Sequence, residues 1–192
     1  MGFRNIPGGI HKTLATSGGG GRLPSLPLFY RLYQDRCLEP DEIYACGPNP
    51  GISTGEFWGT RPARIRAKVH FYEDYVEEGS LNEAEEPLTT PLRNAHHPPH
   101  SFLEILESTV TLDDFEGVKV DIDSSDVEMT IIQAIANRPE IAALIDELYF
   151  EYHFWFDSMD FGWGSVCSGD VDTALGLMRR LRELGIRAYF WI

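Results

Sequence analysis

Hydrophobic residues recur along this chain at two spacings, and each spacing predicts a different element. Short apolar runs predict strands, which lie over residues 42–46, 68–72, 117–122, 147–153 and 186–191. Apolar residues three and four positions apart predict amphipathic helices, which begin near Ser25, Ser101, Ser125, Asn137 and Ser168. The last of these helices ends at Gly185, a residue type that favours the left-handed conformation found at helix ends.

The alternation of these elements predicts an α/β domain. Strands separated by helices favour right-handed crossovers, which build a mostly parallel central sheet with helices on both faces. In such sheets, ligands bind beyond the carboxyl ends of the strands, where the strand order reverses. We therefore expect a ligand site near one of three segments: the turn after residue 46, the turn after residue 121 or the loop after residue 153.

Two parts of the chain follow no apolar pattern. Residues 1–24 contain a run of glycines and are expected to form a loosely ordered N-terminal segment, which leaves residues 25–192 as the α/β domain. Residues 73–100 are acidic and then rich in proline and histidine, so we interpret them as a surface excursion. A length of 192 residues suits one such domain.

Composition and charge narrow the possible partners. Hydrophobic residues make up 43% and charged residues 24%, which is ordinary for a folded domain. The 16 basic and 30 acidic residues give a net charge of −14, which repels nucleic acid and anionic membrane surfaces, so we expect neither as a partner. Three widely spaced cysteines form no disulfide framework, and residues 1–12 contain no apolar signal core, which favours a cytoplasmic protein.

Acidic residues follow the clearest predicted strand. Asp121, Asp123 and Asp126 stand at or just after its carboxyl end, where a carboxylate can hold a hydroxyl, an amine or a metal ion. Alternatively, Asp123 and Asp126 serve only the N-terminus of the next helix, a common role for such residues. His153 ends the aromatic strand at the same edge and is a candidate general base, although a core or rim histidine is the more common case.

A run of glycines and three further histidines are the remaining candidates for a binding site. Gly18–Gly21 can let a backbone approach a nucleotide closely, or can form a flexible linker, because the preceding residues 13–15 make a poor strand. His96, His97 and His100 lie in a predicted loop with no carboxylate or cysteine at ligand spacing, so we expect no metal site there. The chain has no GxSxG, Walker or HExxH motif, which leaves hydrolase, kinase and zinc-protease functions without support.

Several segments together resemble the FkbM-type methyltransferase family. Residues 118–126 are similar to that family's strand end, in which lysine, aspartate and a further acid alternate and another acid follows three positions on. Residues 146–153 are similar to its later strand, which is rich in Phe, Glu and His. Residues 181–187 resemble its last helix–strand unit, and residues 41–45 resemble its second-strand segment. The similarity covers roughly residues 25–192.

The resemblance implies a fold, a cofactor and a reaction. The fold is the three-layer Rossmann-like class I methyltransferase fold, the methyl donor is S-adenosylmethionine, and the reaction is O-methylation of a hydroxyl on a small molecule or glycan. Asp121 would lie beside the methionine part of the donor and the acceptor, and His153 is the second candidate catalytic residue. The residues expected to bind the donor are Gly18, Gly19, Gly20, Gly47, Asp121, Asp123 and Asp126.

Two departures from the family pattern concern the donor site. The family's first strand ends in an acid followed by glycines, whereas residues 14–21 contain the glycines without the acid. The family also has an acid after its second strand that holds the ribose hydroxyls, and Gly47 stands at that position. Loss of this acceptor costs on the order of 1–3 kcal/mol of donor affinity. The alternative function is therefore a catalytically inactive methyltransferase-like domain that acts in binding or as a scaffold.

Overall fold

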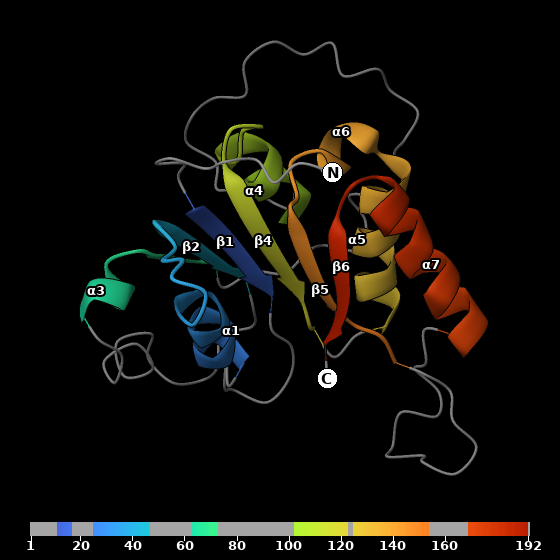
Figure 1. Ribbon diagram of the computed structural model, residues 1–192, viewed down its shortest axis with the longest axis horizontal. Helices are drawn as coiled ribbons and strands as arrows, with labels where there is room; N and C mark the ends of the chain where they lie inside the picture. Colours follow the sequence, from blue (N-terminus) through green and yellow to red (C-terminus); the bar gives the residue numbers. More distant parts are fainter. Residues whose placement is uncertain are drawn as a thin grey trace.

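The computed structural model of the protein describes residues 11–16, 25–46, 63–72, 102–122, 125–153 and 169–191. These residues build an α/β domain around a six-stranded sheet in which all the described strand pairs are parallel (Figure 1). The strands are β1 (His11–Thr16), β2 (Glu42–Cys46), β3 (Val69–Tyr72), β4 (Phe115–Val120), β5 (Glu147–Glu151) and β6 (Arg187–Trp191). The predicted α/β class with a mostly parallel sheet is confirmed.

The strands are arranged across the sheet in the order β3-β2-β1-β4-β5-β6. The chain therefore builds outward from β1 to β3 and then returns to the other side of β1 with β4. The strand order reverses between β1 and β4. Since the strands are parallel, their carboxyl ends share one edge of the sheet, and this edge is where open parallel sheets bind ligands.

The helices divide between the two faces of the sheet. On one face, α1 (Ser25–Gln34) packs Phe29 and Tyr33 against Phe115 and Tyr149. A single helical turn, α3 (Ala63–Arg66), lies near β3 in the chain. The opposite face is covered by α4 (Phe102–Thr109), α5 (Ser125–Asn137), α6 (Pro139–Ala142) and α7 (Val171–Glu183).

Successive side chains of a strand point to opposite faces of the sheet, and this alternation explains why helices pack on both faces. In β5, Leu148 and Phe150 belong to the large core beneath α5 and α7, whereas Tyr149 lies on the α1 side. In β4, Val118 and Val120 belong to the same large core. Full burial of side chains of this size contributes roughly 1.5–3 kcal/mol each, so this core is the main source of stability.

β1 differs from the sequence expectation, which treats residues 1–24 as loosely ordered and residues 13–15 as a poor strand. Residues 11–16 instead form a strand between β2 and β4, and they pair with both neighbours in parallel register. Main-chain hydrogen bonds on both sides stabilise this strand without requiring a strong apolar pattern. Residues 1–10 and 17–24 lie outside the described residues.

The observed bounds of β2 are those predicted from the sequence, whereas the bounds of other strands differ from the predicted ones. β2 spans the predicted residues 42–46, whereas β4 ends at Val120 and β5 ends at Glu151. Both Asp121 and His153 therefore follow a strand rather than belonging to it.

Both ends of α7 can be compared with the sequence. The N-cap is Asp170, whose carboxylate accepts a hydrogen bond from the Thr173 N–H at 2.8 Å, and not Ser168 as expected. The predicted helix end at Gly185 is confirmed, because α7 ends at Glu183 with Leu184 as its C-cap and Gly185 follows with a φ of 99°.

A hydrogen-bonded network surrounds Glu147 at the amino end of β5. Its buried carboxylate accepts hydrogen bonds from the hydroxyls of Tyr33 and Tyr149, at 3.2 and 3.0 Å, and from Arg36 Nη1 at 2.8 Å. Arg187 Nε lies 3.3 Å from the second carboxylate oxygen. We call these five residues the amino-end network.

Burial and the neighbouring charge affect both tyrosines of this network. Burial, with the Glu147 charge, raises the pKa of Tyr33 and raises the pKa of Tyr149 to about 12. Gly117 lets Tyr33 reach Glu147, because a Cβ at position 117 would lie 2.0 Å from the Tyr33 hydroxyl oxygen. The network therefore depends on one close approach between α1 and β4.

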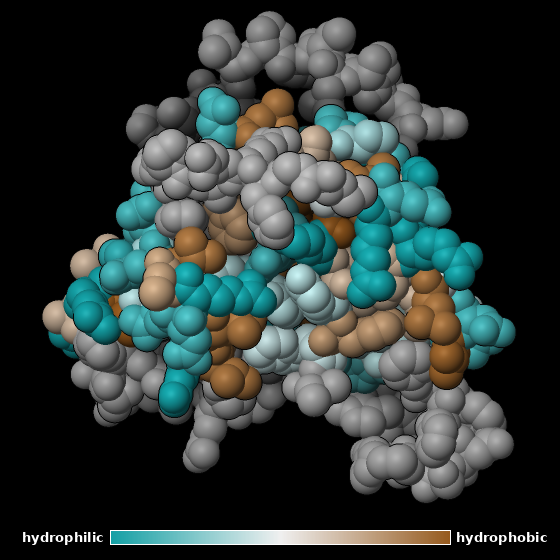
Figure 2. Space-filling model, viewed as in Figure 1, coloured by the Kyte–Doolittle hydropathy of each residue, from teal (hydrophilic) through white to brown (hydrophobic). Residues whose placement is uncertain are grey.

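The described part of the chain contains no helix long and apolar enough to cross a membrane. In the view of Figure 2, hydrophobic residues appear in separate small areas between hydrophilic ones. The exposed large apolar side chains include Leu28 on α1, Leu112, and Val171 and Leu175 on α7.

Candidate functional site

Polar and charged side chains gather where β4 and β5 end. These two strands are neighbours, and their registers pair Val120 with Phe150. The residues that directly follow the strands therefore meet at the same edge of the sheet. This edge lies beside the point between β1 and β4 where the strand order reverses.

Among the described residues, Lys119 places a positive charge at this edge. Its ammonium group is fully buried, forms an ion pair with the Asp121 carboxylate and lies 5.0 Å from the centre of the Trp191 ring. Burial lowers the pKa of Lys119, whereas the negative charges of Asp121, Glu151 and Glu128 act in the opposite direction. Asp121 remains partly accessible, with 17% of its side chain exposed.

Glu128 is held in the first turns of α5. Its side chain is fully buried, and Oε1 accepts a hydrogen bond from the Ile122 N–H at 2.7 Å. This bond connects the start of α5 to the segment that leaves β4 and fixes the direction of the carboxylate. The second oxygen, Oε2, lies 3.6 Å from Nε2 of His153.

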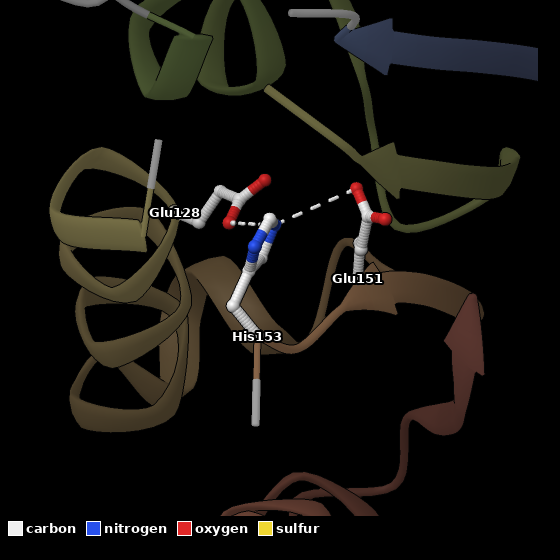
Figure 3. A group of neighbouring side chains, drawn as sticks. All are labelled: Glu128, Glu151 and His153. Carbon is white, nitrogen blue, oxygen red and sulfur yellow. Dashed lines mark ion pairs between the residues drawn. The ribbon is translucent and has the colours of Figure 1, made fainter. Parts of the chain in front are cut away.

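His153 lies between two glutamates, as Figure 3 shows. Its Nε2 is 3.6 Å from Glu128 Oε2 and 3.7 Å from Glu151 Oε2. The imidazole is 5% exposed, whereas the Glu151 side chain is 29% exposed. Nε2 therefore faces two carboxylates, with which it can form an ion pair when it is protonated or share a cation when it is neutral.

We call Lys119, Asp121, Glu128, Glu151 and His153 the carboxyl-end cluster. It combines three carboxylates with one ammonium and one imidazole, in a largely buried setting where charges interact strongly. With the imidazole neutral and the carboxylates ionised, the cluster has an excess of negative charge. Such a site can hold a positively charged ligand group, or a metal ion through its imidazole and carboxylates.

The structure places some of the site residues predicted from the sequence in the carboxyl-end cluster, and others lie elsewhere or outside the described residues. Asp121 and His153 both lie at the predicted edge of the sheet and belong to the cluster. Asp126 is exposed in the first turn of α5, as expected for an acid at a helix N-terminus. The predicted donor-binding residues that lie outside the described residues are Gly18, Gly19, Gly20, Gly47 and Asp123. The loop histidines His96, His97 and His100 also lie outside them.

Sequence reasoning missed Glu128. The spacing of apolar residues in α5 predicts a buried stripe of Val127, Ile131, Ile132 and Ile135, whereas the structure buries Glu128 fully and Val127 only in part. The signal was present in the spacing, because residue 128 is three, four and seven positions before those three isoleucines. A carboxylate in line with an apolar stripe is a candidate for a buried functional group.

No family model, curated protein or solved structure matches this chain. The resemblance carried by the motifs and the geometry of the carboxyl-end cluster are therefore what indicate a function.

Proposed function

We propose that this protein is an S-adenosylmethionine-dependent methyltransferase of the FkbM type that methylates a hydroxyl of a small molecule or glycan. The supporting observation is the parallel strand order β3-β2-β1-β4-β5-β6 with charged groups at the carboxyl ends of β4 and β5. This order is the one used by doubly wound, Rossmann-like sheets that bind nucleotide cofactors. The three-layer class I methyltransferase fold that we propose is one form of this doubly wound, Rossmann-like architecture.

The donor would lie across the point where the strand order reverses. The chain passes from Thr16, at the end of β1, to Ser25, at the start of α1, through a segment that contains Gly18–Gly21. A glycine segment between a first strand and its helix is the arrangement that lets a backbone approach a nucleotide closely. The strand status of residues 11–16 therefore supports the nucleotide-binding interpretation of these glycines over the linker interpretation.

The charge of the carboxyl-end cluster suits this donor. S-adenosylmethionine carries a positive sulfonium and a positive amino group, and a carboxylate at the edge of the sheet can pair with either. Asp121 is the proposed partner because it follows β4 directly and is partly accessible. Excess negative charge in the cluster favours a cationic ligand over a neutral product.

The reaction needs a proton acceptor as well as a donor site. In methyl transfer, the acceptor oxygen forms a bond to the methyl carbon, the carbon–sulfur bond breaks with its electron pair going to sulfur, and the hydroxyl proton goes to a base. Asp121 and Glu151 are the partly exposed carboxylates of the cluster, so one of them would receive this proton. His153 is enclosed by Glu128 and Glu151, and it would orient these carboxylates instead.

A specific observation favours the alternative, a catalytically inactive domain that binds partners or acts as a scaffold. Gly47 occupies the position at which the family has a ribose-binding acid, and Asp121 already pairs with Lys119. An Asp121 whose main role is to neutralise Lys119 would be structural. The two functions differ in whether the protein binds the donor at all.

Calorimetric titration with S-adenosylmethionine and S-adenosylhomocysteine tests the proposal. Wild type and Lys119→Met both retain the Asp121 carboxylate and should bind the donor, whereas Lys119→Met/Asp121→Asn should bind at least tenfold more weakly. A factor of ten corresponds to about 1.4 kcal/mol, the scale of one charged hydrogen bond. Wild type that binds neither compound would favour the scaffold function. Equal affinities in the single and double variants would remove Asp121 from the donor site.

A further inference from the structure

Three potential metal ligands of the carboxyl-end cluster converge from different parts of the chain. Glu128 comes from α5, Glu151 from the end of β5 and His153 from the segment that follows it (Figure 3). Their ligand atoms all lie within 4.8 Å of one another. Imidazole nitrogen and carboxylate oxygen are both common ligands of Zn²⁺ and other divalent transition metals.

The distances are close to those of a metal site. Zinc lies about 2.0–2.2 Å from nitrogen and oxygen ligands, so two ligands at a tetrahedral angle are roughly 3.4 Å apart. The two nitrogen–oxygen separations here are 3.6 and 3.7 Å. Side-chain rotations that shorten these separations would bring the three ligand atoms, which all lie within 4.8 Å of one another, around one ion.

The outer contacts also fit a metal site. Metal-binding carboxylates are commonly oriented by a hydrogen bond to their other oxygen. The Ile122 N–H fills this role for Glu128, because it binds Oε1 and leaves Oε2 directed at His153. This orientation comes from a backbone N–H in the segment between β4 and α5.

Charge gives a third and independent argument. The Lys119 ammonium pairs directly with Asp121. Glu128 and Glu151 both face His153, and two carboxylates brought together in a largely buried setting are costly unless a cation lies between them. A divalent cation neutralises these two glutamates and uses a neutral imidazole, whereas an imidazolium supplies only one positive charge.

We infer that Glu128, Glu151 and His153 bind a divalent transition-metal ion, Zn²⁺ or Mn²⁺, through Oε2 of each glutamate and Nε2 of the histidine. Three protein ligands leave at least one coordination position open, as in catalytic metal sites. This inference goes beyond the proposed methyltransferase, and its test measures metal binding in the absence of any donor.

The experiment uses the full chain after treatment with a chelator. Equilibrium dialysis against Zn²⁺ or Mn²⁺ should give one tightly bound ion per chain. Glu128→Gln, Glu151→Gln and His153→Gln should each weaken that binding at least tenfold. Asp172→Asn removes an exposed carboxylate from α7 and is the matched control, which should bind as wild type does. Glu128→Gln keeps a carbonyl oxygen that can accept from the Ile122 N–H, so this variant is expected to fold.

A second measurement uses wild type alone, so it does not depend on the folding of a variant. One histidine side-chain ¹⁵N resonance should shift on addition of one equivalent of Zn²⁺, and its assignment should be His153. Wild type that binds no stoichiometric ion, or cluster variants that bind as tightly as the Asp172→Asn control, would overturn the inference. Either result would leave the contacts of His153 with the two glutamates as interactions within the chain alone.

Discussion

Glu147 and Glu151 stand at opposite ends of β5, and their surroundings differ in charge. Glu147 at the amino end is one carboxylate shared by two guanidinium groups and two tyrosine hydroxyls. Glu151 at the carboxyl end belongs to a group of three carboxylates with one ammonium and one imidazole. The same strand thus connects one carboxylate that contacts two guanidinium groups to a group in which three carboxylates gather around one ammonium and one imidazole.

The difference separates groups that stabilise the fold from groups that serve a ligand. The amino-end network satisfies its central carboxylate within the chain, so it needs nothing further. The carboxyl-end cluster concentrates negative charge, which costs stability unless a cation is bound. Proteins keep such unfavourable groups at functional sites, because the strain is relieved when the ligand arrives.

The largest expected effect is on the amino-end network. Glu147→Ala removes the shared acceptor of Arg36, Arg187 and two buried tyrosine hydroxyls, and we expect it to lower the free energy of unfolding by about 4 kcal/mol. Urea denaturation measures this change. A loss below about 1 kcal/mol would mean that the network is no more important than an ordinary surface contact.

The next effect concerns the Lys119–Asp121 pair. Asp121→Asn leaves a buried ammonium without its ion-pair partner, so it should cost about 3 kcal/mol. Lys119→Met/Asp121→Asn removes both charges and should recover most of that loss, because a methionine fills the buried space without a charge. Denaturation of the three proteins gives the coupling between the residues. A double variant as unstable as Asp121→Asn would contradict the pairing.

A smaller effect should appear at alkaline pH. The pKa of Tyr149 is about 12 in the folded protein, above its value of about 10 in an unfolded chain. Between these values the unfolded chain has released a proton that the folded chain retains, so stability should fall as pH rises above about 10. Tyr149→Phe should make this fall shallower, at a cost of about 1 kcal/mol at neutral pH. If the melting temperatures of wild type and Tyr149→Phe fell with pH at the same slope, Tyr149 would be excluded as a cause of the alkaline loss of stability.

The smallest effect is predicted for Glu128, the member of the carboxyl-end cluster on α5, in metal-free protein. Glu128→Gln reduces the negative charge and keeps an acceptor for the Ile122 N–H, so stability should change by less than about 1 kcal/mol. Glu147→Gln, the same substitution at the other end of the sheet, should be clearly more destabilising. Calorimetric melting of both variants makes the comparison. A loss of several kcal/mol for Glu128→Gln would place Glu128 among the structural residues.

Much of the fold was predictable because its strands are apolar and its helices amphipathic. The segment 42–46 was assigned correctly, and the other predicted strands overlap those observed. β1 was missed because its stability comes from main-chain pairing with two distant strands, which no local pattern in residues 11–16 reveals. Local sequence patterns therefore predict helices and strands with a strong pattern of their own, and they predict less well those strands whose stability comes from neighbouring strands.

The candidate site was predictable in position and only partly in its residues. Asp121 and His153 follow apolar strands, and parallel strands bring such residues to one edge. The burial of Glu128 depends on how α5 packs on the sheet, and the contact between His153 and Glu128 joins residues 25 positions apart in the chain. These relations follow from tertiary packing, which the strand and helix patterns alone do not specify.

One measurement tests most directly whether ligand binding belongs to the carboxyl end of the sheet. S-adenosylmethionine is titrated by calorimetry into wild type, Glu147→Gln and Lys119→Met/Asp121→Asn, each at a temperature where circular dichroism shows it folded. We predict that Glu147→Gln binds the donor with wild-type affinity although it is less stable, while the carboxyl-end variant binds at least tenfold more weakly. No binding by wild type, or equal weakening in both variants, would contradict the account.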